Sequence, residues 1–277
     1  TLEAGLDAKG YPVAWKHRIV GQSIVAGTPF EGGMVKNGVD HTSVEGASNL
    51  PYAIPNLHVD LHSPRLPVPV LWWRSVGSTH TAFATEVFLD ELAHAAGADP
   101  VEFRRKLLKG HPRHLGVLNL AAEKAGWGKP LPAGWGRGVA VHESFNSYVA
   151  EVAEVSVQPN GEFKVERVVC AVDCGTAVTL DVVKAQMEGG IGFGLAAALH
   201  GAVTLQDGRA VQSNFDDFRI LRMKEMPRVE VHIIASDAPP TGVGEPGVPP
   251  IAPAVANALF AATGKRLRKL PLGTKVV

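Results

Sequence analysis

Residues 148–172 read YVAEVAEVSVQPNGEFKVERVVCAV, and this stretch decides the fold class. Two β-rich segments, 148–157 and 163–172, flank Pro159-Asn160-Gly161-Glu162. An Asn-Gly pair between two such segments is a strong signal for a tight hairpin turn. We therefore predict two strands joined by a short turn in the middle of the chain.

Helices are predicted on both sides of this hairpin. Asp99 is a good N-cap, Pro100 suits the first helical position and Glu102 suits the third, so a helix is expected to begin there. Apolar residues at helical spacing predict further helices. These cover residues 81–96, 114–125, 181–199 and 251–263.

Further strands complete the expected fold. They cover residues 11–24, two short segments around Asp207-Gly208, and residues 228–235. Five prolines keep residues 50–70 extended, because proline lacks the amide donor that a helix needs. Strands and helices alternate irregularly and no internal repeat occurs. The predicted class is α+β, in one unit of residues 1–277 with sub-lobes of about 1–130 and 131–277.

Composition excludes some partners. Lys plus Arg number 27, as do Asp plus Glu, in 277 residues, so neither nucleic acid nor an anionic membrane surface is indicated as a partner. No stretch reaches the roughly 20 apolar residues of a membrane helix. The first residues carry no targeting pattern, and the sequence assigns no compartment. We expect the basic segment 265–269 to be a solvated last strand; a charged docking edge is the alternative.

The two cysteines, Cys170 and Cys174, are too few for a metal centre of their own. Iron–sulfur clusters and structural zinc sites each need four protein ligands as a rule. We therefore expect two buried, reduced thiols.

Alternation along a predicted strand places His58, Asp60 and His62 on one face. Two imidazoles and a carboxylate can hold a transition metal. The same alternation is typical of any half-exposed strand, and we favour that interpretation.

Three other motifs are more specific. Residues 186–194 place Gln186 one turn before a run of glycines, which favours either close helix packing or close approach of a ligand. Residues 241–247 hold Glu245 between glycines and a proline, either as a surface acid or as a general base. Residues 72–78 lead from two tryptophans into a small, polar loop before a helix, where backbone amides suit anionic oxygen ligands.

These motifs, in this order, resemble the molybdopterin-binding large subunit of isoquinoline 1-oxidoreductase-like enzymes in the xanthine oxidase family. The resemblance also rests on residues 88–97 (FLDELAHAAG), 172–175 (VDCG), 244–247 (GEPG) and 249–258 (PPIAPAVANA). It implies mixed sheets with packed helices. The family's upstream cofactor motifs, a Met-Gly-Gln-Gly run and a Gly-Gly-x-Phe-Gly run, do not occur here. The resemblance therefore leads us to expect the C-terminal portion of such a subunit.

The resemblance further implies a molybdenum–molybdopterin cofactor, in its cytosine dinucleotide form, and hydroxylation of an N-heterocycle or aldehyde with water as the oxygen source. Glu245 would be the general base that activates the water-derived nucleophile. The implied cofactor contacts are Arg74, Ser75, Val76, Gly77, Gln186, Gly189, Gly190 and Gly244. Where the family has Asn-Pro before the pterin-contacting helix, this chain has Thr179-Leu180.

Expected partners are the remainder of the molybdopterin-binding subunit and a small subunit carrying 2Fe–2S clusters, which would accept the electrons. A scaffold or binding module that kept the fold without the cofactor is the alternative.

Overall fold

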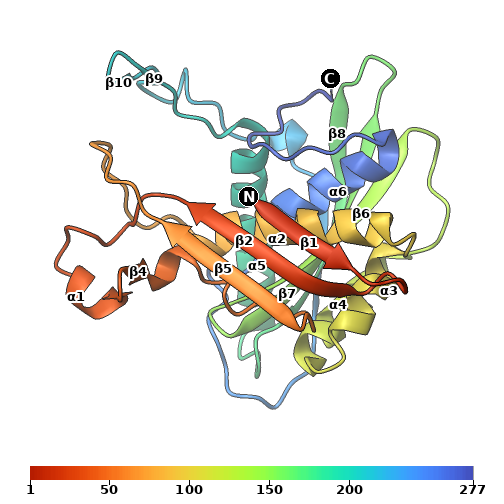
Figure 1. The fold of residues 1–277 in the computed structure, drawn as a ribbon. Coiled ribbons are helices and arrows are strands. Elements are labelled where there is room, and N and C mark those ends of the chain that lie inside the picture. The colour runs from red at the N-terminus through yellow and green to blue at the C-terminus, as the bar shows by residue number, and fades with distance from the viewer. Residues whose placement is uncertain (277) are drawn as a thin grey trace.

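The computed structural model describes residues 1–276, and a four-stranded mixed sheet lies at its centre (Figure 1). The strands run in the order β11-β8-β7-β6. They are β6 (Trp135–Ser144), β7 (Ser147–Val157), β8 (Phe163–Asp173) and β11 (Arg228–Ile233). Neighbours are antiparallel except β11, which pairs with β8 in parallel. The predicted central hairpin is confirmed as β7 and β8.

Helices cover both faces of this sheet. On one face, α6 (Ile251–Thr263) packs across β6 and β7, and α5 (Leu180–His200) lies beside it. On the other face, α4 (Pro112–Ala125) packs against β7 and β8. Alternate strand residues therefore point into two separate apolar cores, because successive side chains of a strand face opposite sides.

Close packing of α6 on β6 depends on glycine. A Cβ added at Gly138 would lie 2.4 Å from the carbonyl oxygen of Ala254 and 2.2 Å from the amide nitrogen of Ala258. Only a residue without a side chain leaves room for the helix backbone at that distance.

A second, three-stranded sheet lies across α2 (Val76–Ala95) in the view of Figure 1. Its strands are β1 (Leu2–Leu6), β2 (Pro12–Val20) and β5 (Asn56–His62), with β2 antiparallel to β1 and parallel to β5. Trp15 is buried and meets Phe88 of α2 edge to face, with ring centroids 5.0 Å apart. This contact joins the small sheet to the rest of the molecule.

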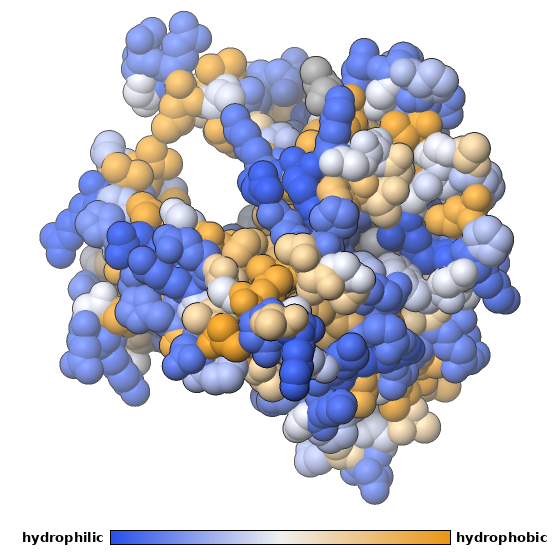
Figure 2. Space-filling view, turned by 45° about the vertical axis from the view of Figure 1, so that its right-hand side comes forward, coloured by the Kyte–Doolittle hydropathy of each residue, from blue (hydrophilic) through white to orange (hydrophobic). Residues whose placement is uncertain are grey.

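The remaining elements are short. They are α1 (Glu31–Met34), β3 (Val35–Lys36), β4 (Val39–Asp40), α3 (Pro100–Leu107), β9 (Leu205–Gln206), β10 (Arg209–Ala210), and single 3₁₀ turns at His41–Ser43 and Met223–Glu225. The segment carrying β9 and β10 projects from the body, as does the loop around residues 64–72 (Figure 1). Figure 2, turned by 45° from the view of Figure 1, shows hydrophobic patches on the surface and an opening between outlying segments and the body.

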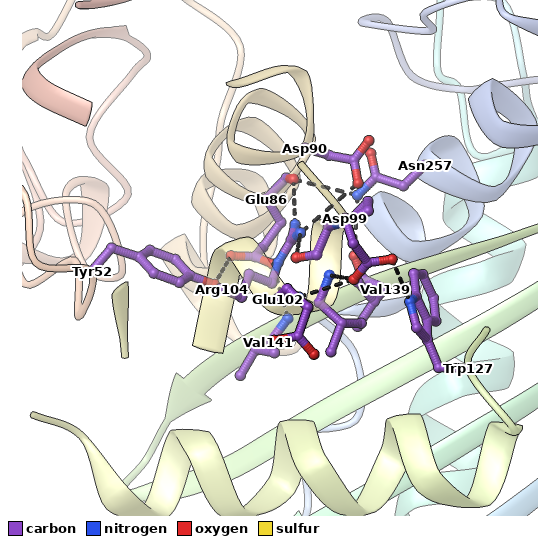
Figure 3. A network of polar contacts seen from close by, with 12 residues as sticks. Tyr52, Glu86, Asp90, Asp99, Glu102, Arg104, Trp127, Val139, Val141 and Asn257 are labelled. Carbon is purple, nitrogen blue, oxygen red and sulfur yellow. Dashed lines mark hydrogen bonds and ion pairs between the residues drawn. The ribbon is translucent and has the colours of Figure 1, made fainter. Parts of the chain in front are cut away.

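A buried polar network joins α2, α3 and β6 (Figure 3). Glu86 and Arg104 form an ion pair with Oε2 and Nε 3.0 Å apart. Tyr52 donates its hydroxyl hydrogen to Glu86 at 2.6 Å, and the amide of Val141 donates to the same carboxylate at 3.0 Å. Asn257 of α6 donates to the carbonyl oxygen of Val139 at 3.1 Å. The network therefore fixes three helices against the edge of the central sheet.

Most predicted elements are confirmed, with shifted ends. Asp99 accepts hydrogen bonds from the amides of Val101 and Glu102, each at 2.9 Å, as its predicted N-cap role requires. Cys170 and Cys174 are buried free thiols, as expected. In the described part of the chain, no helix is both long and apolar enough to cross a bilayer.

The predicted last strand over residues 265–269 is wrong. This segment is irregular, and its arginines bind α2 instead. Arg266 lies 2.6 Å from a carboxylate oxygen of Asp90, and Arg268 lies 2.7 Å from one of Glu91. Ion pairs with a helix, not sheet pairing, hold the segment in place.

Candidate active site

Glu245 lies on the loop between β11 and α6 and meets the residue just before α2. Its carboxylate Oε1 accepts a hydrogen bond from the amide of Ser75 at 2.9 Å, and its backbone oxygen accepts one from the Ser75 hydroxyl at 2.8 Å. Within residues 1–276, no hydrogen bond engages the second carboxylate oxygen, Oε2. Glu245 is half-buried, whereas Pro246 and Gly247 after it are buried. Glu245 is therefore held through its backbone and through Oε1, and Oε2 stays open within the described residues.

The loop that meets Glu245 has an unusual backbone. Ser75 and Val76 both adopt left-handed conformations, with φ of 71° and 47°. Such conformations disfavour residues other than glycine and persist only where surrounding contacts impose them. At Gly77, an added Cβ would lie 1.7 Å from the carbonyl oxygen of Thr42, so no larger residue fits. The loop is thus confined between Thr42 on one side and Glu245 on the other.

Arg74 ties three segments of the chain together. Its guanidinium donates to the carbonyl oxygen of Gly244, with Nε at 2.8 Å, and its Nη2 donates to Oε1 of Gln186 at 3.2 Å. The same group lies over the ring of Phe193, 5.6 Å from its centroid. Arg74, Gln186, Gly244 and Glu245, widely separated in the sequence, therefore form one cluster.

The amides at the start of α2 are already engaged by a carboxylate of this chain. Oε1 of Glu45 accepts from the amides of Gly77 at 2.7 Å and Ser78 at 3.2 Å. Burial raises the pKa of the Glu45 carboxyl. The sequence predicted these amides as contacts for anionic ligand oxygens, and in this structure Glu45 occupies that position. Sequence reasoning missed Glu45, because its loop carries no recognisable pattern.

The glycines of α5 divide between the two interpretations that the sequence left open. A Cβ at Gly190 would lie 3.2 Å from the Cα of Gly247, and one at Gly194 would lie 2.7 Å from a methyl carbon of Ile251. These two glycines permit close packing of the helix. Gly189, in contrast, faces open space and, like Gln186, lies at the surface. Packing therefore explains Gly190 and Gly194, while Gly189 and Gln186 form a surface that a ligand can approach.

Two cavities border this cluster. They have volumes of about 320 and about 350 Å³, and Trp73 lines both. Val76, Gly77 and His80 line the first; Phe193, Phe218 and Ile220 line the second. Trp73 and Phe193 contact each other with ring centroids 4.8 Å apart. Flat apolar surface thus lies immediately beside the polar cluster.

The His58, Asp60 and His62 face is occupied by an ion pair. Arg18 lies 2.7 Å from Oδ1 of Asp60, and His58 Nε2 lies 3.3 Å from Oδ2. Across residues 1–276, no three His, Cys, Asp or Glu side chains are placed to hold a metal ion. The strand-face interpretation agrees with these contacts.

The cluster fits a large, anionic cofactor with several hydrogen-bonding groups. Arg74 supplies a fixed positive charge, and the amide group of Gln186 lies at the surface. Gly189 leaves open space where a Cβ would stand. Beside them, Glu245 offers a carboxylate oxygen that no other described residue engages.

Comparison with known proteins identifies the family. Residues 81–227 match a family described as a molybdopterin cofactor-binding domain, and residues 1–108 match a second family with the same description. The chain belongs to the molybdopterin cofactor-binding domain family. Arg74 and Gln186 lie inside the matched ranges, whereas Glu245 lies outside both.

Curated relatives are oxidoreductases or dehydrogenases by name. The chain is 38% identical over 226 residues to the beta subunit of isoquinoline 1-oxidoreductase from Brevundimonas diminuta, covering 80% of this chain and 29% of the relative. It is 33% identical over 252 residues to a subunit of nicotinate dehydrogenase from Pseudomonas putida, covering 84% and 21%. The chain thus spans less than a third of the length of these relatives.

Solved structures share the fold. Quinoline 2-oxidoreductase from Pseudomonas putida 86 superposes with a TM-score of 0.82 at 13% identity, covering 99% of this chain and 60% of that one. Aldehyde oxidoreductase from Desulfovibrio gigas gives 0.73 at 14% identity, covering 99% and 48%. The α+β class, with mixed sheets and packed helices as in molybdenum hydroxylases, is confirmed.

Proposed function

We propose that this chain is part of a molybdenum hydroxylase that oxidises an N-heteroaromatic or aldehyde substrate with water as the oxygen source. The observation that carries this proposal is the placement of Glu245. One carboxylate oxygen is held by the amide of Ser75, and the other has no hydrogen-bond partner among residues 1–276, beside the Arg74 and Gln186 cluster. A scaffold has no use for an acid held in this way.

The cofactor in this proposal is molybdenum–molybdopterin, in the cytosine dinucleotide form. Arg74 and Gln186 would hold its polar and anionic groups. Gly189 and Gly244, which are exposed, would allow its close approach; Gly190, which the sequence also suggested, is buried against Gly247 and is not part of this surface. Residues 75–77 form the adjoining loop. When bound, the cofactor supplies the two-electron oxidation and activates a water-derived nucleophile.

Glu245 acts as the general base. Its free Oε2 takes the proton that the nucleophile loses, while Oε1 stays hydrogen-bonded to Ser75. A positioned base of this kind contributes typically about 10²–10⁴-fold to a rate. The buried Pro246 and Gly247 restrict movement of the loop, so the carboxylate keeps its direction.

Partners complete the enzyme in this account. The remainder of the molybdopterin-binding subunit covers the two projecting segments. The support for this is that both segments expose apolar side chains, among them Leu66, Leu71, Val203 and Phe215. A small subunit with 2Fe–2S clusters accepts the electrons, because the two cysteines here are buried and cannot hold a cluster alone.

The substrate class rests on the relatives. Their names include isoquinoline, nicotinate and aldehyde enzymes, so N-heterocycles and aldehydes are both candidate substrates. The cavity that Trp73 and Phe193 line offers aromatic surface that suits a flat substrate.

The test is purification of the complex from its natural source, followed by elemental analysis and a turnover screen with both substrate classes. We expect molybdenum and iron together with turnover of at least one class. The chain expressed alone is expected to retain neither molybdenum nor activity. A native complex without molybdenum would contradict the proposal.

A further inference from the structure

We propose that Ser75 is the positioning residue of the Glu245 base, acting through its hydroxyl and its backbone amide. This inference rests on the proposed function, and it assigns Ser75 to the base instead of the cofactor contacts that the sequence suggested.

Both polar groups of Ser75 engage Glu245. The amide lies 2.9 Å from the carboxylate Oε1, and the hydroxyl lies 2.8 Å from the backbone oxygen of the same residue. Ser75 is fully buried, so its hydroxyl is closed to a ligand from outside. The backbone oxygen of Glu245 also accepts from the amide of Val248 at 2.9 Å, but Ser75 contacts both the backbone and the carboxylate of the acid.

The left-handed backbone of Ser75 makes this two-point contact possible. Its φ of 71° turns the amide and the side chain toward the same neighbour. The loop is held in that state by Thr79, whose hydroxyl donates to the carbonyl oxygen of Arg74 at 2.9 Å, and by Glu45, which binds the amide of Gly77. Strained backbone that is over-determined by its surroundings is characteristic of functional sites.

Contacts on the other side of the Glu245 loop hold only its backbone and a neighbouring hydroxyl. Ser147 donates to the carbonyl oxygen of Gly242 at 2.7 Å and lies 2.7 Å from the Thr241 hydroxyl. Within the described residues, the amide of Ser75 is the hydrogen-bond donor that reaches the Glu245 carboxylate itself. The direction of the base therefore depends on Ser75.

The first experiment compares Ser75→Ala and Ser75→Gly in the assembled enzyme. Both remove the hydroxyl, but glycine also tolerates the left-handed backbone without strain. We expect kcat to fall about tenfold in both, with KM and molybdenum content unchanged, because the Glu245 backbone loses one of its hydrogen bonds and the base is held less firmly. Ser144→Ala is the matched control, since Ser144 is a buried serine whose hydroxyl forms no hydrogen bond with any described residue.

Three results would overturn the inference. An unchanged kcat would show that the hydroxyl does not position the base. Loss of molybdenum with normal turnover per metal would assign Ser75 to the cofactor. A rate in Ser75→Gly equal to that of the wild type would assign the effect of alanine to backbone strain.

A second readout needs no turnover and stands apart from the proposed function. Hydrogen exchange of the Ser75 amide, measured by mass spectrometry on the assembled enzyme, should be slow in the wild type and in Glu245→Gln, which keeps an acceptor oxygen. It should be fast in Glu245→Ala. Equal exchange in all three proteins would show that the contact does not exist, whatever reaction the enzyme performs.

Discussion

Arg104 of α3 lies against Glu86 of α2 deep in the core, with Nε 3.0 Å from Oε2 and neither side chain more than 1% exposed. Glu86 also accepts hydrogen bonds from the Tyr52 hydroxyl, the Val141 amide and the Asn257 side chain (Figure 3). Such a pair is stable only while every member keeps its partners, because an unpaired charge in the core has no water to solvate it.

Glu86→Ala is expected to lower the free energy of unfolding by about 3–5 kcal/mol, because it leaves Arg104 charged and unpaired. Urea unfolding followed by circular dichroism measures this change. The control is Glu91→Ala, which breaks the surface pair with Arg268 and should cost at most about 1 kcal/mol. Equal losses in the two variants would contradict the structural role of the buried pair.

Glu151 predicts a pH dependence of stability. It is fully buried on β7 beside Cys170 and Ala140, and neither carboxylate oxygen has a hydrogen-bond partner in the part of the chain that the structure describes. Burial raises the pKa of its carboxyl well above 4.5. The folded state binds the Glu151 proton more tightly than the unfolded state does. Protonation of Glu151 therefore contributes its full stabilisation of the fold below pH 4.5. It is lost as pH rises toward the folded pKa, by up to about 1.4 kcal/mol per pH unit.

Glu151→Gln removes this titration, so the variant should gain stability relative to the wild type as pH rises above 4.5. Unfolding curves at several pH values measure the difference. Glu154→Gln on the same strand is the control; it loses ion pairs with Arg137 and Arg167 and should be less stable than the wild type at neutral pH. A pH-independent difference for Glu151→Gln would refute the assignment.

Arg74→Lys tests the cluster around the proposed cofactor site. Lysine keeps the charge but lacks the planar fork that binds Gly244 and Gln186 together. A lost charge-assisted hydrogen bond costs about 1.5–3 kcal/mol, so we expect at least about tenfold weaker retention of molybdenum, measured by elemental analysis after dialysis. Arg18→Lys, which alters the surface pair with Asp60, should leave the metal content unchanged. Full retention in Arg74→Lys would remove this residue from the site.

Local signals explain which elements could be predicted. The central hairpin, the Asp99 cap and the helix 251–263 are each specified by residues close in sequence, and all are confirmed. Strand β6 was not predicted, because its two glycines weaken the strand pattern. Those glycines serve the packing of α6, a contact between residues more than 100 positions apart.

Long-range contacts also account for the errors. Helix α2 begins at Val76, five residues before the predicted start at residue 81, because Glu45 caps amides of its first turn. The segment 265–269 is irregular because its arginines find carboxylates on α2. For the candidate site, the motifs indicated Arg74, Gln186 and Glu245, which the structure brings together. The contacts of Ser75 and Arg74 with the Glu245 loop, and those of Glu45, are visible only in the structure. None of these pairings has a signature in the sequence.

The most direct test of the account is Glu245→Gln in the assembled enzyme. Gln keeps the length and planarity of Glu and can still accept the hydrogen bond from Ser75, so the loop should keep its course. The amide cannot take a proton, and we expect turnover to fall by about 10²–10⁴-fold or more at unchanged molybdenum content. Steady-state rates and metal analysis of both proteins decide the question. A variant that is replete with molybdenum and retains at least about a tenth of the wild-type rate would contradict the role of Glu245 as the base. A tenfold loss of rate corresponds to a rise of roughly 1.4 kcal/mol in the activation barrier.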